Sequence, residues 1–435
     1  MNIRSGLSVL ILLAFGPAAP IAHADLHAVL HQIDTDSPSL AAANSRAEAS
    51  AANLRVVRSR YFGSASLFGE RVDYNSPRLI GPISPPIDLA NIAVDDSQRG
   101  FGVAFSVPLD IDRRIAAAVG EQRQLSKAAV HDAQHIRLFL FNRAVLVYRG
   151  LQELQGNREA LQAQHKALEK NYQVVKTKVD VGRVPRVELL RIDAERKAVI
   201  GQLAALDGQE IGLRAAIAAL LGQQNYADEI TVVNTAPREF NAHDATDILQ
   251  RPDVKAAERR VAAAHEKLKA SKRAWLPNMQ LQANKSRNEG LSTRHEDTWS
   301  VLLRLNWELW DGGRRMAGID NASAGLMALK SELSATRNQA QQELDTAVAS
   351  WRAARLQCES AVVGLAAATE TERIQSDRFQ AGRISAADLI DAEAALAAAL
   401  ASKTSAMVRW WLADDSAHLA VGLVPTAYTE AGAGE

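Results

Sequence analysis

The sequence contains one stretch twice: GRVPRVELLRIDA at residues 182–194 returns 200 positions later as GRISAADLIDAEA at residues 382–394. The match extends upstream, where Pro38 recurs as Pro252. That pair is 214 positions apart, so the first copy carries 14 extra residues between about 62 and 107. Because an internal duplication defines the unit that a fold must explain, the sequence predicts two structural repeats of about 200 residues each.

The N-terminus has the pattern of a secretory signal peptide. A charged start at Arg4 precedes an apolar run over 7–15 and an Ala-x-Ala ending at 22–24, so we expect cleavage before Asp25. No cysteine directly follows that site, so a lipid anchor is not indicated. The single cysteine, Cys358, cannot form an intrachain disulfide and is expected to pack in a helix.

Composition and motifs narrow the functional classes. Beyond the N-terminus no run of about 18 apolar residues occurs, so any entry into a membrane must use strands. The 50 acidic and 50 basic residues balance, which argues against a nucleic-acid partner. No phosphate-binding loop, zinc-ligand spacing or nucleophile elbow is present. The sequence therefore predicts neither an enzyme nor a bound cofactor or metal.

Two proline-free segments predict very long helices, over about 112–179 and about 314–380. In the first, apolar residues recur at every seventh position, as in a coiled-coil seam, although Arg158 and His165 interrupt a second stripe. The seam consists of Leu140, Val147, Leu154, Leu161, Leu168 and Val175. The heptad pattern continues after the break at 182–185, which predicts an antiparallel helical hairpin. At about 1.5 Å per residue each long helix would span about 100 Å.

Alternating sequence before each long helix predicts β-strands. Apolar residues fill the odd positions of 299–309 and of 101–109, while most even positions are polar or small. Weaker alternation precedes each of them, over about 61–73 and about 275–285. Two such hairpins fit either a membrane β-barrel or a soluble amphipathic domain. Tryptophans near the strand ends favour a membrane interface; they are Trp275, Trp299, Trp307 and Trp310.

Four strands cannot close a barrel, and open strand edges are not tolerated in lipid. Since barrels begin at about 8 strands, we expect three copies to assemble into a barrel of about 12 strands, continued by about 12 periplasmic helices. The predicted fold is mainly α-helical with a membrane β-barrel, built from a duplicated β-hairpin and long antiparallel coiled-coil helices.

The expected division of the chain follows from these elements. It comprises a signal peptide at 1–24, a first repeat at 25–222 (β-hairpin about 61–109, helical tip about 180–187), an inter-repeat segment at 223–250, a second repeat at 251–424 (β-hairpin about 275–310, helical tip about 380–388) and a disordered tail at 425–435.

Together these features resemble the TolC-like outer membrane factor family. The resemblance rests on the duplicated order of two strands and a long helix, on the WDGGR junction at 310–314 and on the two glycine-containing tips, and it covers about 25–422. It implies a homotrimeric outer-membrane channel that extends into the periplasm and acts as the passive exit duct of a tripartite efflux or type I secretion system. The implied partners are a periplasmic adaptor protein, an inner-membrane RND, ABC or MFS transporter, and outer-membrane lipid. Nothing in the sequence distinguishes a drug, metal, peptide or protein cargo.

The resemblance also assigns roles at the two helical tips. It implies that the adaptor contacts Gly182, Arg183, Val184 and Pro185 in the first repeat, and Gly382, Arg383, Ile384 and Ser385 in the second. It further implies that Asp388 and Asp391 line the pore aperture, with Glu188 as their counterpart in the first repeat.

The residues themselves support two interpretations of the aspartates. Asp388 and Asp391 are three apart, so they share a helix face, and threefold symmetry would gather their carboxylates around one axis. Ser385 and Asp388 also match a capping box, which needs no pore. The first tip departs from the family's pattern, because it holds Pro185 and has Arg191 where an acid or amide is expected.

Two other functions stay open on the sequence. A soluble coiled-coil tether in the periplasm would use the long helices without a barrel. A stand-alone porin would use the barrel without an inner-membrane partner.

Overall fold

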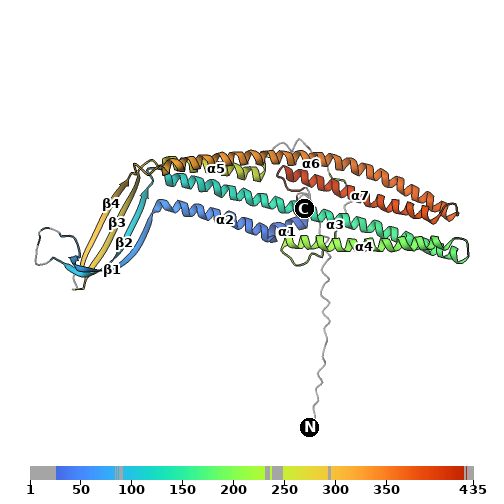
Figure 1. Cartoon of the computed structure of the whole chain (residues 1–435), viewed down its shortest axis with the longest axis horizontal. Helices are drawn as coiled ribbons and strands as arrows, with labels where there is room; N and C mark the ends of the chain where they lie inside the picture. The colour runs from blue at the N-terminus through green and yellow to red at the C-terminus, as the bar shows by residue number, and fades with distance from the viewer. Residues whose placement is uncertain are drawn as a thin grey trace, which may run out of the picture.

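The computed structural model of the chain describes residues 26–83, 85, 87, 92–230, 236–237, 248–291, 295–425 and 428. The predicted signal peptide and most of the predicted C-terminal tail lie outside these residues. The body is elongated, with a β-sheet at one end and two helical hairpins that point away from it (Figure 1).

Two helices of 67 residues run the length of the helical region, α3 (Arg114–Asp180) and α6 (Arg314–Gln380). Each turns at its far end into a shorter antiparallel helix, α4 (Arg186–Leu221) or α7 (Ala386–Ala420) (Figure 1). The prediction of two long helices, each closed into an antiparallel hairpin, is confirmed.

Shorter helices complete the half of the body nearest the sheet. Helix α2 (Pro38–Ser59) packs on α3, and α5 (Pro252–Arg273) packs between α3 and α6. Each short helix starts where a return helix ends. Gly222, after α4, lies against Pro38, and Gly422, after α7, lies against Pro252. The duplication therefore produces two equivalent joints, and the short 3₁₀ helices η1 (Arg60–Phe62) and η2 (Ile248–Gln250) flank α2 and α5.

The strands form one antiparallel sheet in the order β1–β2–β3–β4. Their bounds are β1 Ser64–Leu79, β2 Val94–Leu109, β3 Asn278–Gly290 and β4 His295–Asn306. Pairing of β2 with β3 joins the two predicted hairpins into a single sheet. Strands β1 and β4 are left as its two edges.

Several details of the strand prediction are wrong. The strand expected over 101–109 already begins at Val94, and the one expected over about 61–73 extends to Leu79. The strand expected over 299–309 ends at Asn306, because the Trp307 indole N–H donates to the Trp275 carbonyl (3.1 Å) and Asp311 accepts from the backbone N–H groups that open α6. Trp299 does not lie at a strand end; it lies within β4, opposite Lys285.

The two faces of the sheet differ in polarity in the half nearest the helices, whereas in the far half the odd-numbered face is charged and Arg287 pairs with Asp297 at 2.7 Å. One face carries the odd-numbered residues, where apolar side chains form cross-strand rows such as Ala65, Phe105, Ala283 and Val301, or Leu109, Met279 and Leu305. The other face carries amides and hydroxyls that bond to each other. Gln280 donates to Ser106, Ser286 bonds to Thr298 (2.9 Å) and Ser300 bonds to Asn284 (2.5 Å). The predicted alternation thus separates an apolar face from a polar one.

The helical core is distributed along the body. The largest apolar cluster lies about midway, where α1 (Leu26–Asp36) buries Leu30 and Ile33 against Phe141 and Tyr148 of α3. Near the tips Leu168 and Val175 of the predicted seam are buried with Ile192 and Val199 of α4, so this part of the seam is confirmed.

One predicted interruption of the seam has a structural reason. Arg158 contacts Asp207 and Glu210 of α4, both at 2.6 Å.

In the described part of the chain, no helix is long and apolar enough to cross a lipid bilayer.

Candidate functional site at the helical tips and on the concave wall

The two helical tips share one backbone turn. Gly182 and Gly382 adopt positive φ values of 74° and 71°, a conformation that glycine reaches without strain. In both tips the next residue donates its N–H to a carbonyl five positions back, Arg183 to Lys178 (2.8 Å) and Arg383 to Arg378 (2.9 Å). This is the Schellman end of an α-helix. The repeated glycine therefore fixes the same turn twice.

The return helices then start differently. Ser385 and Asp388 form the predicted capping box: the Asp388 N–H donates to the Ser385 hydroxyl (3.3 Å), and the Ser385 N–H donates to the Asp388 carboxylate (3.0 Å). Pro185 precedes α4 at the equivalent position and provides no side-chain cap. The hydrogen bonds from Ser385 hold the pKa of Asp388 below its usual range.

The tips are held together by an apolar cluster that both hairpins share. Val184 and Ile384, expected to contact an adaptor, are partly buried against this cluster, whereas Arg183 and Arg383 are exposed. Phe379 of α6 enters the same cluster, and the Lys178 ammonium of α3 lies 4.6 Å from its ring centroid. The first and second hairpins are thus coupled at their ends.

The three predicted aperture carboxylates lie in different surroundings. Asp388 and Asp391 are exposed, whereas Glu188 is half-buried. The Oε2 atom of Glu188 is buried and has no hydrogen-bond partner among the described residues. The structure therefore brings the two aspartates onto one exposed surface and leaves Glu188 out of it.

A cavity lies farther along α7 from the tip. Ser416, Leu412 and Arg409 line the cavity, and steps of three and four residues back along α7 lead from them to Asp391 and Asp388. Such steps keep to one face of a helix. The aspartates therefore lie on the same face of α7 as the cavity wall.

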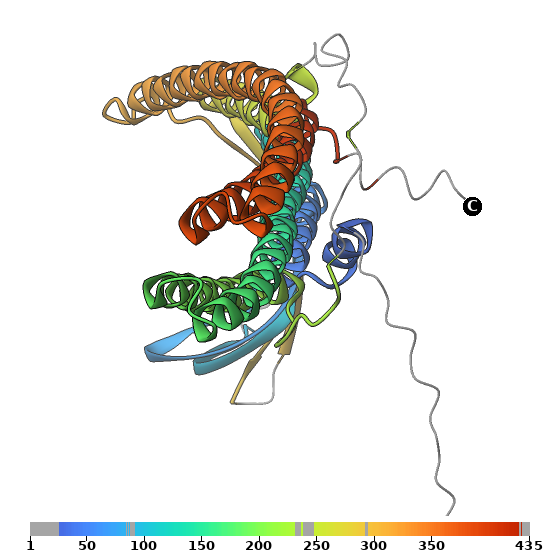
Figure 2. The same ribbon diagram turned by 90° about the vertical axis from the view of Figure 1, so that its right-hand side faces the viewer.

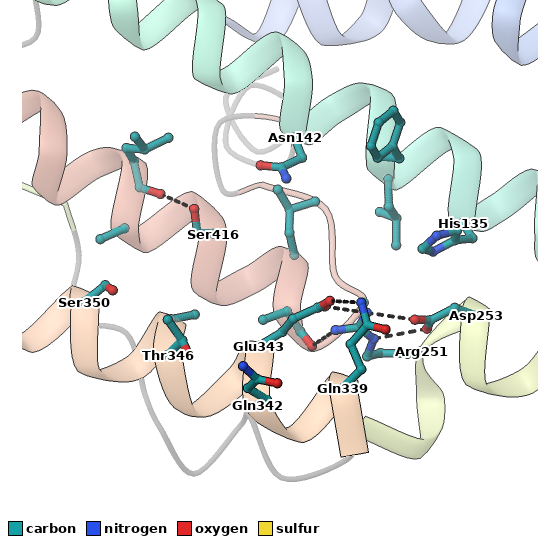
Figure 3. Close-up of a pocket in the computed structure, with 18 of the residues that line it drawn as sticks. His135, Asn142, Arg251, Asp253, Gln339, Gln342, Glu343, Thr346, Ser350 and Ser416 are labelled. Atoms are coloured by element: carbon teal, nitrogen blue, oxygen red, sulfur yellow. Dashed lines mark hydrogen bonds and ion pairs between the residues drawn. The ribbon is translucent and has the colours of Figure 1, made fainter. Parts of the chain in front are cut away.

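The cavity has a volume of about 1630 Å³ and lies between α3, α6 and the joint of α5 with α7. Its walls combine alanine and leucine side chains with amides and hydroxyls, which include Asn142, Gln339, Gln342, Thr346 and Ser350 (Figure 3). On α3 it is lined by His135 and Phe139, about opposite the face on which Arg137 contacts Asp34 of α1. Because α1 covers the convex side of the curved helical layer (Figure 2), the cavity opens on the concave side.

Ion pairs hold the joint at one end of this cavity. Arg251 contacts Asp253 and Glu343, each at 2.8 Å, and donates to the Ala420 carbonyl at 3.0 Å (Figure 3). One guanidinium thus links the start of α5, the end of α7 and the side of α6. The equivalent residue of the first repeat is Ser37, which has no side chain able to make these contacts.

Sequence reasoning missed two buried polar groups on α7. Asp415 binds Arg149 of α3 at 3.0 Å with both side chains almost fully buried. Glu393 is 5 % exposed and accepts a hydrogen bond from the Asn171 amide of α3. In the sequence, Glu393 stands among alanines, and a lone acid in such a stretch of α7 is the signal that could have found it. Among the described residues no group of three or more His, Cys, Asp or Glu side chains is placed to hold a metal.

The family model described as outer membrane efflux protein matches residues 29–223 and 247–410. The chain is 24% identical over 306 residues to nodulation protein T of Rhizobium leguminosarum bv. trifolii, covering 68% of this chain and 65% of that protein. It is 23% identical over 231 residues to outer membrane efflux protein BepC of Brucella suis biovar 1, covering 52% of this chain and 50% of that protein.

A solved structure has the same fold over nearly the whole chain. The outer membrane protein VceC of Vibrio cholerae aligns with a TM-score of 0.78 at 19% identity, over 92% of this chain and 96% of that one. At this identity the likeness concerns the fold.

Proposed function

Because the chain belongs to the outer membrane efflux protein family, we propose that it forms the passive exit duct of a tripartite efflux or type I secretion system. It is an outer-membrane protein whose helices extend into the periplasm. The proposed duct carries cargo from the periplasm to the exterior, and selection and energy coupling lie in its partners.

The observation that carries this proposal is a sheet with two faces and two open edges. In the half of the sheet nearest the helices, the apolar face suits lipid and the amide-rich face suits a water-filled interior. Among the described residues, strands β1 and β4 each pair on one side only, and lipid does not tolerate such open edges. In a trimer each β4 would pair with β1 of the next copy and close a barrel of about 12 strands.

The helical edges suit the same closure. Leu356 and Val363 are exposed seven residues apart on α6. On α4, Gly201 and Gly208 are also seven apart, and open space surrounds the position of a Cβ at each. Large apolar residues on one edge and glycines on the other allow close packing of α6 against α4 of the next copy. The expected product is a trimer with about 12 helices continuing the barrel.

Oligomeric mass separates this proposal from a periplasmic tether. We expect the protein to be extracted from outer membranes only with detergent and to have the mass of a trimer in native mass spectrometry. A soluble monomer recovered from the periplasm would reject the duct. Val363→Glu should dissociate the trimer, because it places a charge in the proposed contact between copies.

Two exposed tips at the periplasmic end suit an adaptor protein. We expect deletion of residues 383–387 to abolish export in cells while leaving trimer assembly intact. Unchanged export would reject the tripartite system and favour a stand-alone porin.

The exposed pair Asp388 and Asp391 suits the aperture. Three copies would gather their carboxylates around one axis, where they would attract cations. In planar bilayers the double variant Asp388→Asn, Asp391→Asn should lose cation selectivity, seen as a shift of the reversal potential in a salt gradient. An unaltered reversal potential would remove these residues from the pore.

A further inference from the structure

Glu393 is a buried carboxyl group at the contact between the two helical hairpins. It lies about two turns into α7, close to the exposed pair Asp388 and Asp391. Its Oε1 atom accepts from the Asn171 amide of α3, and its Oε2 atom is buried without a hydrogen-bond partner among the described residues. An ionised carboxylate needs several donors, so this site suits the neutral acid.

The charged groups facing Glu393 give it no close counter-ion. Glu372 of α6 has the same sign, and Lys170 of α3 acts on it only at a distance. Burial, and then the charge of Glu372, raise the pKa of Glu393 to about 7. The acid is therefore largely protonated on the acid side of neutrality.

The equivalent acid of the first repeat is neutralised in another way. Asp193 of α4 contacts Arg196 at 2.8 Å and is half-exposed. The residue equivalent to Arg196 in α7 is Leu396. The first repeat thus pairs its acid with a cation, whereas the second buries it between helices.

We propose that Glu393 holds α7 against α3 as a neutral carboxylic acid, and that loss of its proton loosens this contact and favours opening of the second tip. The inference rests on the proposed duct, since it regulates the aperture that Asp388 and Asp391 would form. When Glu393 ionises, the buried charge is satisfied only if water reaches it, and α7 must move away from α3 and α6 to admit water. The aperture aspartates lie on the first turns of α7 and move with it.

The direction of the pH dependence follows from this assignment. The closed state binds the proton more tightly than an open, hydrated state, in which Glu393 regains an ordinary pKa near 4.3. Opening is therefore suppressed at acid pH, becomes easier as pH rises, and levels off above a pH of about 7. One proton changes the open-to-closed ratio by up to about tenfold per pH unit.

Planar-bilayer conductance of the full-length protein tests the inference. Wild-type conductance should rise between pH 5 and 7 and then level off, whereas Glu393→Gln should keep the low conductance up to pH 8. Asp193→Asn is the matched control and should follow the wild-type curve. Asn171→Leu should move the rise to higher pH, because the amide hydrogen bond favours the charged form.

The outcomes separate this inference from the proposed function. Currents with the same pH profile in wild type and Glu393→Gln would overturn the inference and leave the duct intact. Absence of current from the wild type at every pH would reject the duct, and the inference with it. Infrared difference spectra between pH 5 and 8 provide a check without current. The protonated-carboxyl band that disappears in wild type should be smaller in Glu393→Gln, where Asp415, whose pKa burial raises to about 6, still contributes. Equal bands in the two proteins would also overturn the inference.

Discussion

The two return helices, α4 and α7, begin with the same turn and then differ in their cations. The acids Glu188 and Asp193 correspond to the acids Asp388 and Glu393, whereas Arg191 corresponds to Asp391 and Arg196 to Leu396. The backbone of the turn has stayed the same, because a helix end with glycine at positive φ admits few alternatives. The duplication has therefore kept a scaffold, while the side chains of the two tips have diverged.

The contacts of the two helices with α3 differ in the same way. Helix α4 is fixed to α3 by partly exposed ion pairs, such as Arg158 with Asp207, whose side chains are 22% and 66% exposed. Helix α7 is fixed by the buried pair Arg149 and Asp415, at 4% and 0%. A buried pair responds far more strongly to loss of one partner than an exposed pair. The contact of α7 with α3 therefore depends on the specific pair Arg149 and Asp415, whereas the contact of α4 with α3 depends less on any one ion pair.

The largest expected effect comes from breaking that buried pair. Arg149→Ala leaves Asp415 buried without its counter-ion and should lower the free energy of unfolding of the helical region by about 3–5 kcal/mol. Arg158→Ala should lower it by less than about 1 kcal/mol, because its acids keep their water. Urea unfolding followed by helical circular dichroism measures both. Equal losses in the two variants would contradict the distinction between the two contacts.

A double replacement controls for the space that the truncation of Arg149 leaves in the packed interior. Arg149→Leu with Asp415→Leu removes both charges and should recover most of the loss, because apolar side chains of similar size tolerate burial. Failure to recover would mean that the packing around the pair, rather than the unpaired charge, sets the cost.

Much of this fold could be predicted from the sequence because its elements follow simple periods. The seven-residue spacing of Leu168 and Val175 indicated the seam, and the repeated glycines indicated both tips. The alternation predicts a strand that ends at Leu309, three residues beyond the observed end of β4. The error arises because Trp307 and Leu309 continue the apolar pattern after the strand pairing has stopped. The hydrogen bond from Trp307 to Trp275 that marks the end joins residues 32 positions apart.

The candidate site could be predicted from the sequence only where its residues are close neighbours along the chain. The capping box of Ser385 and Asp388 lies within one helical turn and is confirmed. The contacts of Glu393 with Asn171 and of Asp415 with Arg149 join α7 to α3 across more than 200 positions. No spacing rule links such residues, so their partners emerge only when the two hairpins are packed together.

A second prediction compares the apolar residue that follows the acid in each tip. Leu389 is 2% exposed within the shared tip cluster, whereas Leu189 is only partly buried. Leu389→Ala should cost about 2–5 kcal/mol, and Leu189→Ala should cost clearly less. Hydrogen exchange of the tip segments, measured by mass spectrometry, should show faster exchange over 379–392 in Leu389→Ala. Similar exchange in both variants would mean that the two tips contribute equally to the cluster.

The smallest effect concerns the residue that precedes each return helix, Ser385 or Pro185. Ser385→Ala removes the hydroxyl that accepts from the Asp388 N–H and should cost about 1 kcal/mol, which corresponds to roughly fivefold faster exchange in the first turn of α7. Pro185→Ala should leave the first turn of α4 nearly unchanged, because Pro185 makes no side-chain cap.

The pH dependence of the cap has a definite sign. The capping hydrogen bonds lower the pKa of Asp388 in the folded chain, so their stabilisation is complete above its unfolded pKa of about 3.9 and is lost as pH falls through the lower folded value. The difference in exchange between wild type and Ser385→Ala should therefore be constant near neutrality and shrink in acid. A difference that stays constant into acid would mean that the hydroxyl caps α7 without the carboxylate. Asp388 would then be free to serve the aperture alone.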